Sequence, residues 1–144
     1  MASIKLGGNE IRFISIFESI TGSSVRDCII DEDDDRIVFV VNPGNIALAI
    51  GKKGANIRRA REFLKKTIDV VEYAPNAEEF LKNTLAPARV KNIIINNSRD
   101  NKQIANIYVD SRDRGIAIGK NGRNIAKARM LAKRHFNITD VIIK

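Results

Sequence analysis

The sequence predicts an α+β fold built from two copies of one small unit. Residues 47–66 match residues 115–134 at 10 of 20 positions, an offset of 68 residues. The hydrophobic patterns around both stretches predict the same order of elements, helix, strand, strand, short helix, turn, longer helix and strand. We therefore expect domains at residues 1–74 and 75–144. Each would have a three-stranded sheet covered by helices, and because each core is small we expect the two to pack as a rigid tandem.

The first unit opens with an amphipathic helix. Phe13, Ile16, Phe17 and Ile20 recur at the spacing of one helical face, and Gly22 is placed to end the helix. Two β-branched segments at 26–30 and 37–41 predict strands, joined by an exposed acidic turn at 31–35. Asn and Pro at 42 and 43 predict the cap and first residue of a short helix that ends at residue 50. A longer helix at 54–66 and a strand at 68–73 complete the unit.

The second unit repeats this order. Asn76 and Glu79 have the spacing of a helix-capping pair, and Pro87 stops the helix that follows. Strands are predicted at 90–95 and 104–109, joined by a polar turn at 97–101. Asp110 or Ser111 is expected to cap a short helix ending at residue 118. A long helix at 122–135 and a strand at 138–143 follow.

The charge is uneven along the chain. The net charge of +8 arises entirely after residue 74, where 14 Lys+Arg face 6 Asp+Glu, whereas the first half has 11 of each. A surplus of this size is typical of proteins that bind polyanions. The single cysteine, Cys28, excludes an internal disulfide and indicates a reducing, cytoplasmic setting. No apolar run is long enough for a membrane span, so we expect no membrane association.

The repeated core of each unit is a basic turn between two glycines, at 51–54 and 119–122. The first amides of a helix lack internal partners and the helix dipole adds positive charge there, so an anion is attracted to the start of the following helix. Glycines let a ligand backbone come close because they have no side chain. Lys52, Lys53 and Lys120 add mobile positive charges. The pattern favours binding of a phosphodiester backbone.

These two turns, Ile50-Gly51-Lys52-Lys53-Gly54 and Ile118-Gly119-Lys120-Asn121-Gly122, resemble the signature loop of KH domains, which hold about four nucleotides of a single strand. The element order is similar to the type II version. Two such units in succession resemble the tandem KH region of NusA transcription termination and antitermination factors. The 144 residues leave no room for the polymerase-binding and OB-fold modules of bacterial members, so the chain is most similar to the short archaeal form.

The resemblance implies that single-stranded RNA runs as an extended strand across both units, with its bases against an apolar groove formed by the helices beside each loop and the middle strand. It implies RNA polymerase as a further partner, and we expect a monomer without cofactor or metal. The RNA-binding residues it implies are Ala49, Ile50, Gly51, Lys52, Lys53, Gly54, Asn56, Ile57, Arg58 and Arg59 in the first unit. In the second they are Arg114, Ile118, Gly119, Lys120, Asn121, Gly122, Arg123, Asn124, Ile125 and Lys127.

Asn121 stands where the first loop has a second lysine, which predicts a weaker second clamp unless Arg114 and Arg123 compensate. Two alternatives stay open: a duplex-DNA reader that uses the helix-turn-helix-like corner, and an assembly protein of the ribosome or the polymerase. A nucleotide-hydrolysing P-loop is disfavoured because no Ser or Thr follows either Gly-Lys pair.

No carboxylate pair or nucleophile with a base is visible, so we do not expect an enzyme. The acidic run at 31–35 is interpreted as a solvated hairpin tip that faces away from the RNA, His135 as a partly exposed helix end and Cys28 as a core residue.

Overall fold

The computed structural model describes residues 6–98 and 100–144, and its contacts divide the chain after Ala74. The start of the first predicted domain and the middle of the turn predicted at 97–101 lie outside the described residues. The first unit contains α1 (Gly8–Thr21), β1 (Val25–Asp31), β2 (Arg36–Val41), α2 (Ile46–Ile50), η1 (Lys52–Gly54), α3 (Ala55–Leu64) and β3 (Thr67–Glu72). The second contains α4 (Ala77–Leu85), β4 (Val90–Asn97), β5 (Gln103–Val109), η2 (Ser111–Asp113), α5 (Arg114–Ile118), η3 (Lys120–Gly122), α6 (Arg123–Phe136) and β6 (Ile138–Ile143).

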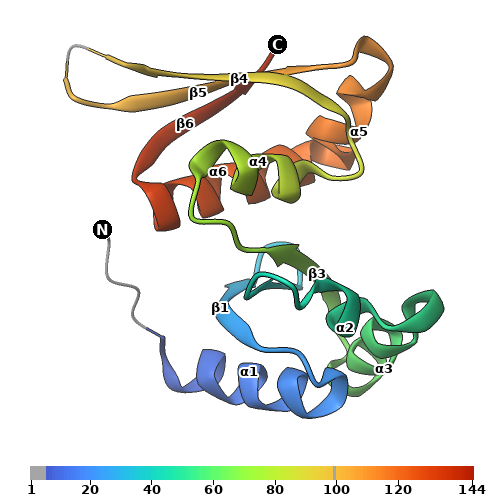
Figure 1. Cartoon of the computed structure of the whole chain (residues 1–144). Coiled ribbons are helices and arrows are strands. Elements are labelled where there is room, and N and C mark those ends of the chain that lie inside the picture. Colours follow the sequence, from blue (N-terminus) through green and yellow to red (C-terminus); the bar gives the residue numbers. More distant parts are fainter. Residues whose placement is uncertain (1–5, 99) are drawn as a thin grey trace. The chain divides into compact units, whose positions relative to one another are not determined.

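Each unit is a mixed three-stranded sheet with helices packed against it (Figure 1). The sheet orders are β1-β2-β3 and β4-β5-β6, and in both sheets the first pair of strands is antiparallel and the second pair parallel. The first pair is interrupted at the same place in each unit, between Val25 and Asp27 and between Val90 and Asn92. The α+β class and the predicted order of elements are therefore confirmed.

The core of the first unit lies between its sheet, α1 and α3. The rings of Phe17 from α1 and Phe39 from the central strand stack with centroids 4.1 Å apart, and Ile37, Ala60 and Ile68 are fully buried around them. Cys28 is buried in this core, as predicted. The core holds α3, and with it the first loop, in a fixed position against the sheet.

The core of the second unit has the same layout with different side chains. Leu81 and Leu85 of α4 pack with Ala128 and Ala132 of α6 and with the inner face of the sheet. Partly buried His135 lies edge-on to Phe80, with ring centroids 5.3 Å apart. The alanines of α6 let the two helices approach closely, so α6 and the second loop are positioned as α3 is in the first unit.

Several predicted helix ends are confirmed by their hydrogen bonds. Gly22 is in the left-handed conformation (φ 74°) and its amide donates to Glu18, which ends α1. The side chain of Asn76 accepts from the amide of Glu79 at 3.0 Å, and that of Asp110 accepts from the amide of Arg112 at 3.0 Å. The capping pattern was thus readable from local sequence alone.

The predicted start of the short helix α2 is wrong. The helix begins at Ile46 with Asn45 as its N-cap residue, and Pro43 lies in the turn that precedes it. Gly44 has φ 86°, a conformation that a right-handed helix does not allow. Because the helix starts later, Asn45 links the turn to the segment just before β1, where its Oδ1 accepts from the amide of Ser24 at 2.9 Å.

The acidic turn is more than a solvated tip. The guanidinium of Arg36 is buried, and it donates to Asp31 at 3.0 Å and to Asp69 of β3 at 3.1 Å. The ammonium of Lys66 lies 2.7 Å from the carboxylate of Asp35. Asp31 and Asp69 therefore neutralise the buried Arg36, and together the pairs fix the hairpin against β3.

Candidate nucleic-acid interface

The two glycine loops have nearly the same backbone. Gly51 has φ/ψ 78°/171° and Gly119 has 80°/164°, and the closing glycines have 76°/17° (Gly54) and 72°/19° (Gly122). In each loop the amide of the second glycine donates to the carbonyl of the first, at 3.1 and 3.0 Å. The backbone angles of the paired glycines differ by at most 7°, so the two loops repeat in geometry as well as in sequence.

Glycine is required at the first position of each loop for two reasons. Its positive φ is a conformation that residues with a side chain rarely adopt. A Cβ on Gly51 would also lie 2.8 Å from the amide nitrogen of Asn56 and 2.7 Å from that residue's Cγ. The equivalent atom on Gly119 would lie 2.8 Å from the amide nitrogen of Asn124. Neither turn can therefore accommodate a side chain at its first glycine.

Most of the predicted cationic site residues are exposed around the loops. Lys52, Lys53, Arg58 and Arg59 surround the first loop, and Arg114, Lys120 and Arg123 are the exposed cations at the second. Lys127 differs, because it is 6% exposed within α6 and is poorly placed to reach a ligand. One cation also stabilises its own loop: Nη1 of Arg58 donates to the carbonyl oxygen of Lys53 at 2.5 Å.

Asn56 and Asn124, predicted as RNA contacts, point toward the protein. The Nδ2 of Asn56 donates to the carbonyl of Leu48 at 2.8 Å, and the Nδ2 of Asn124 donates to that of Ile116 at 2.7 Å. Both bonds cross the loop, from the start of the following helix to the end of the preceding one. The sequence shows that asparagine recurs at this position, but it does not show that the side chain points toward the protein.

The apolar residues beside the loops divide into exposed and buried ones. Ala49 is fully buried, and Ile57 and Ile125 are half-buried against the two cores. Ile50 is 40% exposed, whereas Ile118 is half-buried. Two exposed members were not predicted from the sequence, Leu48 at 51% and Ile116 at 46%. In both short helices an alanine lies between two large apolar residues, a pattern that does not show which of the two is exposed.

An ion pair between Asp113 and Arg89 anchors the start of α5, the short helix that leads into the second loop. The Oδ2 of Asp113 accepts from the backbone amide and from Nε of Arg89, both at 2.8 Å, and its Oδ1 accepts from Nη2 at 3.2 Å. These bonds lower the pKa of Asp113 to about 2. Donation from the Arg112 guanidinium lowers the pKa of Asp110 as well. The start of α5 is thereby tied to the start of β4.

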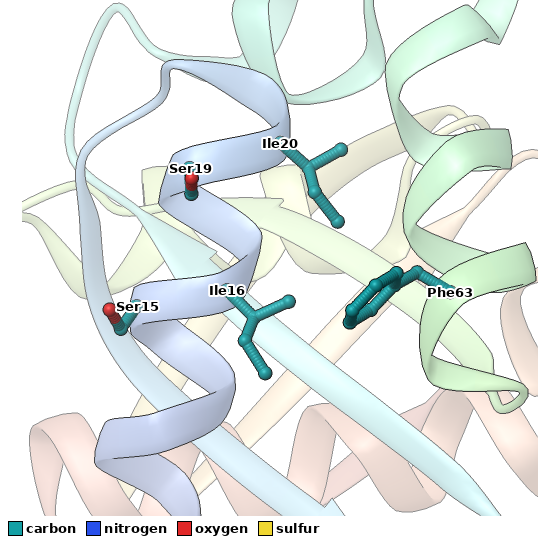
Figure 2. A pocket seen from close by; sticks show the side chains of 5 residues that line it. All are labelled: Ser15, Ile16, Ser19, Ile20 and Phe63. Atoms are coloured by element: carbon teal, nitrogen blue, oxygen red, sulfur yellow. The ribbon is translucent and has the colours of Figure 1, made fainter.

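A separate pocket lies between α1 and α3 of the first unit. It has a volume of about 340 Å³ and is lined by Ser15, Ile16, Ser19, Ile20 and Phe63 (Figure 2). The ring of Phe63 is 67% exposed, whereas Leu131, at the equivalent position of the second unit, is fully buried. The two units therefore differ on this outer helical face while their loops agree.

No helix within the described residues is long and apolar enough to cross a membrane. The same residues contain no group of three or more His, Cys, Asp or Glu side chains arranged to hold a metal ion.

The fold and both loops define a tandem KH-domain protein. The family model for the KH domain matches residues 11–75, and that for the NusA-like second KH domain matches residues 77–143. A crystal structure of APE1850 has a TM-score of 0.86 and 37% identity, and the match covers 96% of this chain and 100% of that one.

Similar archaeal proteins show to which family of KH-domain proteins the chain belongs. The probable transcription termination protein NusA of Halococcus morrhuae is 41% identical over 96% of both chains. The protein of the same name from Methanocaldococcus jannaschii is 32% identical, over 98% of this chain and 75% of its own. This chain belongs to the NusA family.

Proposed function

We propose that this protein binds single-stranded RNA through its two Gly-x-x-Gly loops and influences the termination or antitermination of transcription. The observation that carries the proposal is the shared backbone of the two loops, each placing two glycines and the start of a helix beside exposed lysines. A phosphate beside Gly51 or Gly119 would approach the glycine backbone without interference from a Cβ, close to the positive end of the following helix's dipole.

Charge assists this contact. Lys52 and Lys53 flank the first loop and Lys120 the second, all of them exposed. Their ammonium groups are flexible point charges that suit a phosphate backbone whose exact course varies. Neutralising phosphates releases counterions, so binding should weaken as salt is added.

Bases would be held by apolar contact. The exposed side chains of Leu48, Ile50 and Ile116 stand beside the loops on α2 and α5, where unstacked bases could cover them. Burying such side chains contributes about 25 cal/mol per Å² of apolar surface. This mode favours a single strand over a duplex, because paired bases keep their faces stacked.

The role in transcription follows from the relatives, which bear the name of probable transcription termination proteins. Nascent RNA is the single strand that such a protein would meet, and RNA polymerase is the protein partner that the family suggests. A binding function explains the exposed cations without any catalytic group, so we propose that the protein is not an enzyme.

Charge reversal tests the clamp directly. Lys120→Asp and the double variant Lys52→Asp/Lys53→Asp should each weaken binding of a short single-stranded RNA by about tenfold or more. Each lost phosphate contact should lower the salt slope by about 0.7. Fluorescence anisotropy at several salt concentrations measures both quantities. Lys102→Asp, an exposed lysine in the turn between β4 and β5, is the control with the same charge change as Lys120→Asp and should bind nearly as the wild type does.

Competition separates this proposal from its rivals. Unlabelled single-stranded RNA should displace the probe, and duplex DNA of equal length should not. Preferential displacement by the duplex would indicate a DNA reader. Weak binding of every nucleic acid, together with stable co-purification with ribosome or polymerase, would indicate an assembly protein.

A further inference from the structure

The two asparagines that follow the loops occupy the same place in both units. Asn56 and Asn124 lie two residues after the closing glycine, at the second position of α3 and α6. Their neighbours differ between the units: Ala55 corresponds to Arg123, and position 126 is alanine where the first unit has Arg58. The asparagine therefore recurs together with both loop glycines and the isoleucine that follows it, although other neighbours change.

Each asparagine supplies a hydrogen bond that the short preceding helix lacks. The last four carbonyls of a helix have no partner within it. In α2 the carbonyl of Ala47 accepts from the amide of Gly51 at 2.8 Å, and that of Leu48 accepts from Asn56 Nδ2 at 2.8 Å.

The second unit repeats both bonds. The carbonyl of Gly115 accepts from the amide of Gly119 at 2.9 Å, and the carbonyl of Ile116 accepts from Asn124 Nδ2 at 2.7 Å. The side chain thus caps the helix on the far side of the loop.

This cap fixes the loop because α2 and α5 are too short to hold themselves in place. Each has five residues, well below the length at which an isolated helix is stable. The asparagine also packs on the first glycine, since a Cβ on Gly51 would lie 2.9 Å from Cβ of Asn56. One side chain therefore sets both the angle between the two helices and the path of the glycine backbone.

We propose that Asn56 and Asn124 are positioning residues that set the geometry of the two clamps and do not grip RNA through their amide nitrogens. This inference rests on the proposed function for its effect on RNA. The carbonyl that each Nδ2 binds belongs to Leu48 or Ile116, whose side chains are exposed beside the loop. The asparagine therefore orients the apolar contact for the bases together with the backbone contact for the phosphates.

Substitution by leucine tests this role because leucine has the same number of side-chain heavy atoms and the same branching at Cγ but no donor. In Asn56→Leu without RNA, the amide NMR signals of Gly51 and Gly54 should shift and their hydrogen exchange should accelerate. Affinity for a short single-stranded RNA should fall about fivefold to tenfold, the scale of one lost hydrogen bond. The salt slope should fall too, because phosphate contacts are lost with the loop geometry. Asn124→Leu should act in the same way on Gly119 and Gly122.

Asn9→Leu is the matched control, because Asn9 is the second residue of α1, a helix that carries no glycine loop. It should leave loop signals and affinity unchanged. Measurements are made well below the melting temperature of each variant. Should a leucine variant fail to fold, the smaller Asn56→Ser and Asn124→Ser variants, which cannot reach the carbonyl, take its place with the same expectations.

Two outcomes overturn the inference. Reduced affinity with unchanged loop signals would make the asparagines direct RNA contacts, and unchanged affinity with unchanged loop signals would leave them no role in the clamp. The NMR comparison uses no RNA, so it still tests the loop geometry if the wild-type protein fails to bind. A wild-type protein that does not bind RNA would overturn the proposed function, not the role of the asparagines.

Discussion

The two loops reach one backbone geometry with different residues at the strained position. The third residue is Lys53 in the first loop and Asn121 in the second, with φ 54° and φ 58°. A left-handed conformation costs an ordinary L-residue about 1–2 kcal/mol, whereas asparagine adopts it more readily. The first loop thus has an additional positive charge, on a residue in an unfavourable backbone conformation. The second loop lacks that charge, but its asparagine adopts the same conformation at lower cost.

The loops also differ in what holds them. In the first, Arg58 binds the carbonyl of the strained Lys53 directly. In the second unit Ala126 takes the position of Arg58, and the helix before the loop is anchored by the Asp113–Arg89 contact. The first clamp is stabilised within the loop and the second at its base, so equal geometry does not mean equal sensitivity to mutation.

Among the changes that compare the two loops, exchanging the strained residues should have the largest effect. Lys53→Asn should weaken RNA binding about threefold to tenfold through the lost charge. It should also stabilise the protein by about 0.5 kcal/mol, because asparagine tolerates the left-handed backbone. Asn121→Lys should do the reverse in the second loop. Binding titrations and thermal unfolding measure the two effects.

Lys52→Asn is the control for the first exchange. It removes the same charge at a residue outside the left-handed region, so it should weaken binding without raising stability. If Lys53→Asn and Lys52→Asn changed stability equally, strain at position 53 would not distinguish the loops.

A smaller effect is a loss of stability in acid, which should arise from the Asp113–Arg89 contact of the second unit. Because Arg89 lowers the pKa of folded Asp113 to about 2 from an ordinary 3.8, the contact stabilises the fold fully above about pH 4. That contribution should disappear as the pH falls toward 2. The melting temperature of the wild type should therefore exceed that of Asp113→Asn at pH 6, and the gap should close by pH 2. The exposed Asp100→Asn is the control, and a gap that stays constant with pH would contradict this assignment.

Sequence predicted the fold well because its signals are local. Gly22 as a helix stop, Asn76 as a cap and the glycine turns depend on a few neighbouring residues, and the strand at 138–143 has the predicted bounds. The start of α2 was missed because Gly44 and Asn45 are fixed by bonds to residues distant in the sequence, Glu72 of β3 and Ser24 just before β1.

The site was harder to predict because exposure depends on tertiary packing. Ala49 and Lys127 are buried, and Leu48 and Ile116 are exposed, although all four lie on helices beside the loops. A helix of five residues has too short a pattern to show which face turns inward. The inward direction of Asn56 likewise depends on where α2 ends.

An NMR titration tests the central claim most directly. Isotope-labelled protein is titrated with a single-stranded RNA of about ten nucleotides, enough for two clamps of about four nucleotides each. If both loops bind RNA, the amides of residues 51–54 and 119–122 should all shift, as should those of Leu48 and Ile116, while those of the hairpin tip at 32–35 stay unchanged. Shifts confined to one loop, or absent from both, would contradict a protein that grips RNA at two points.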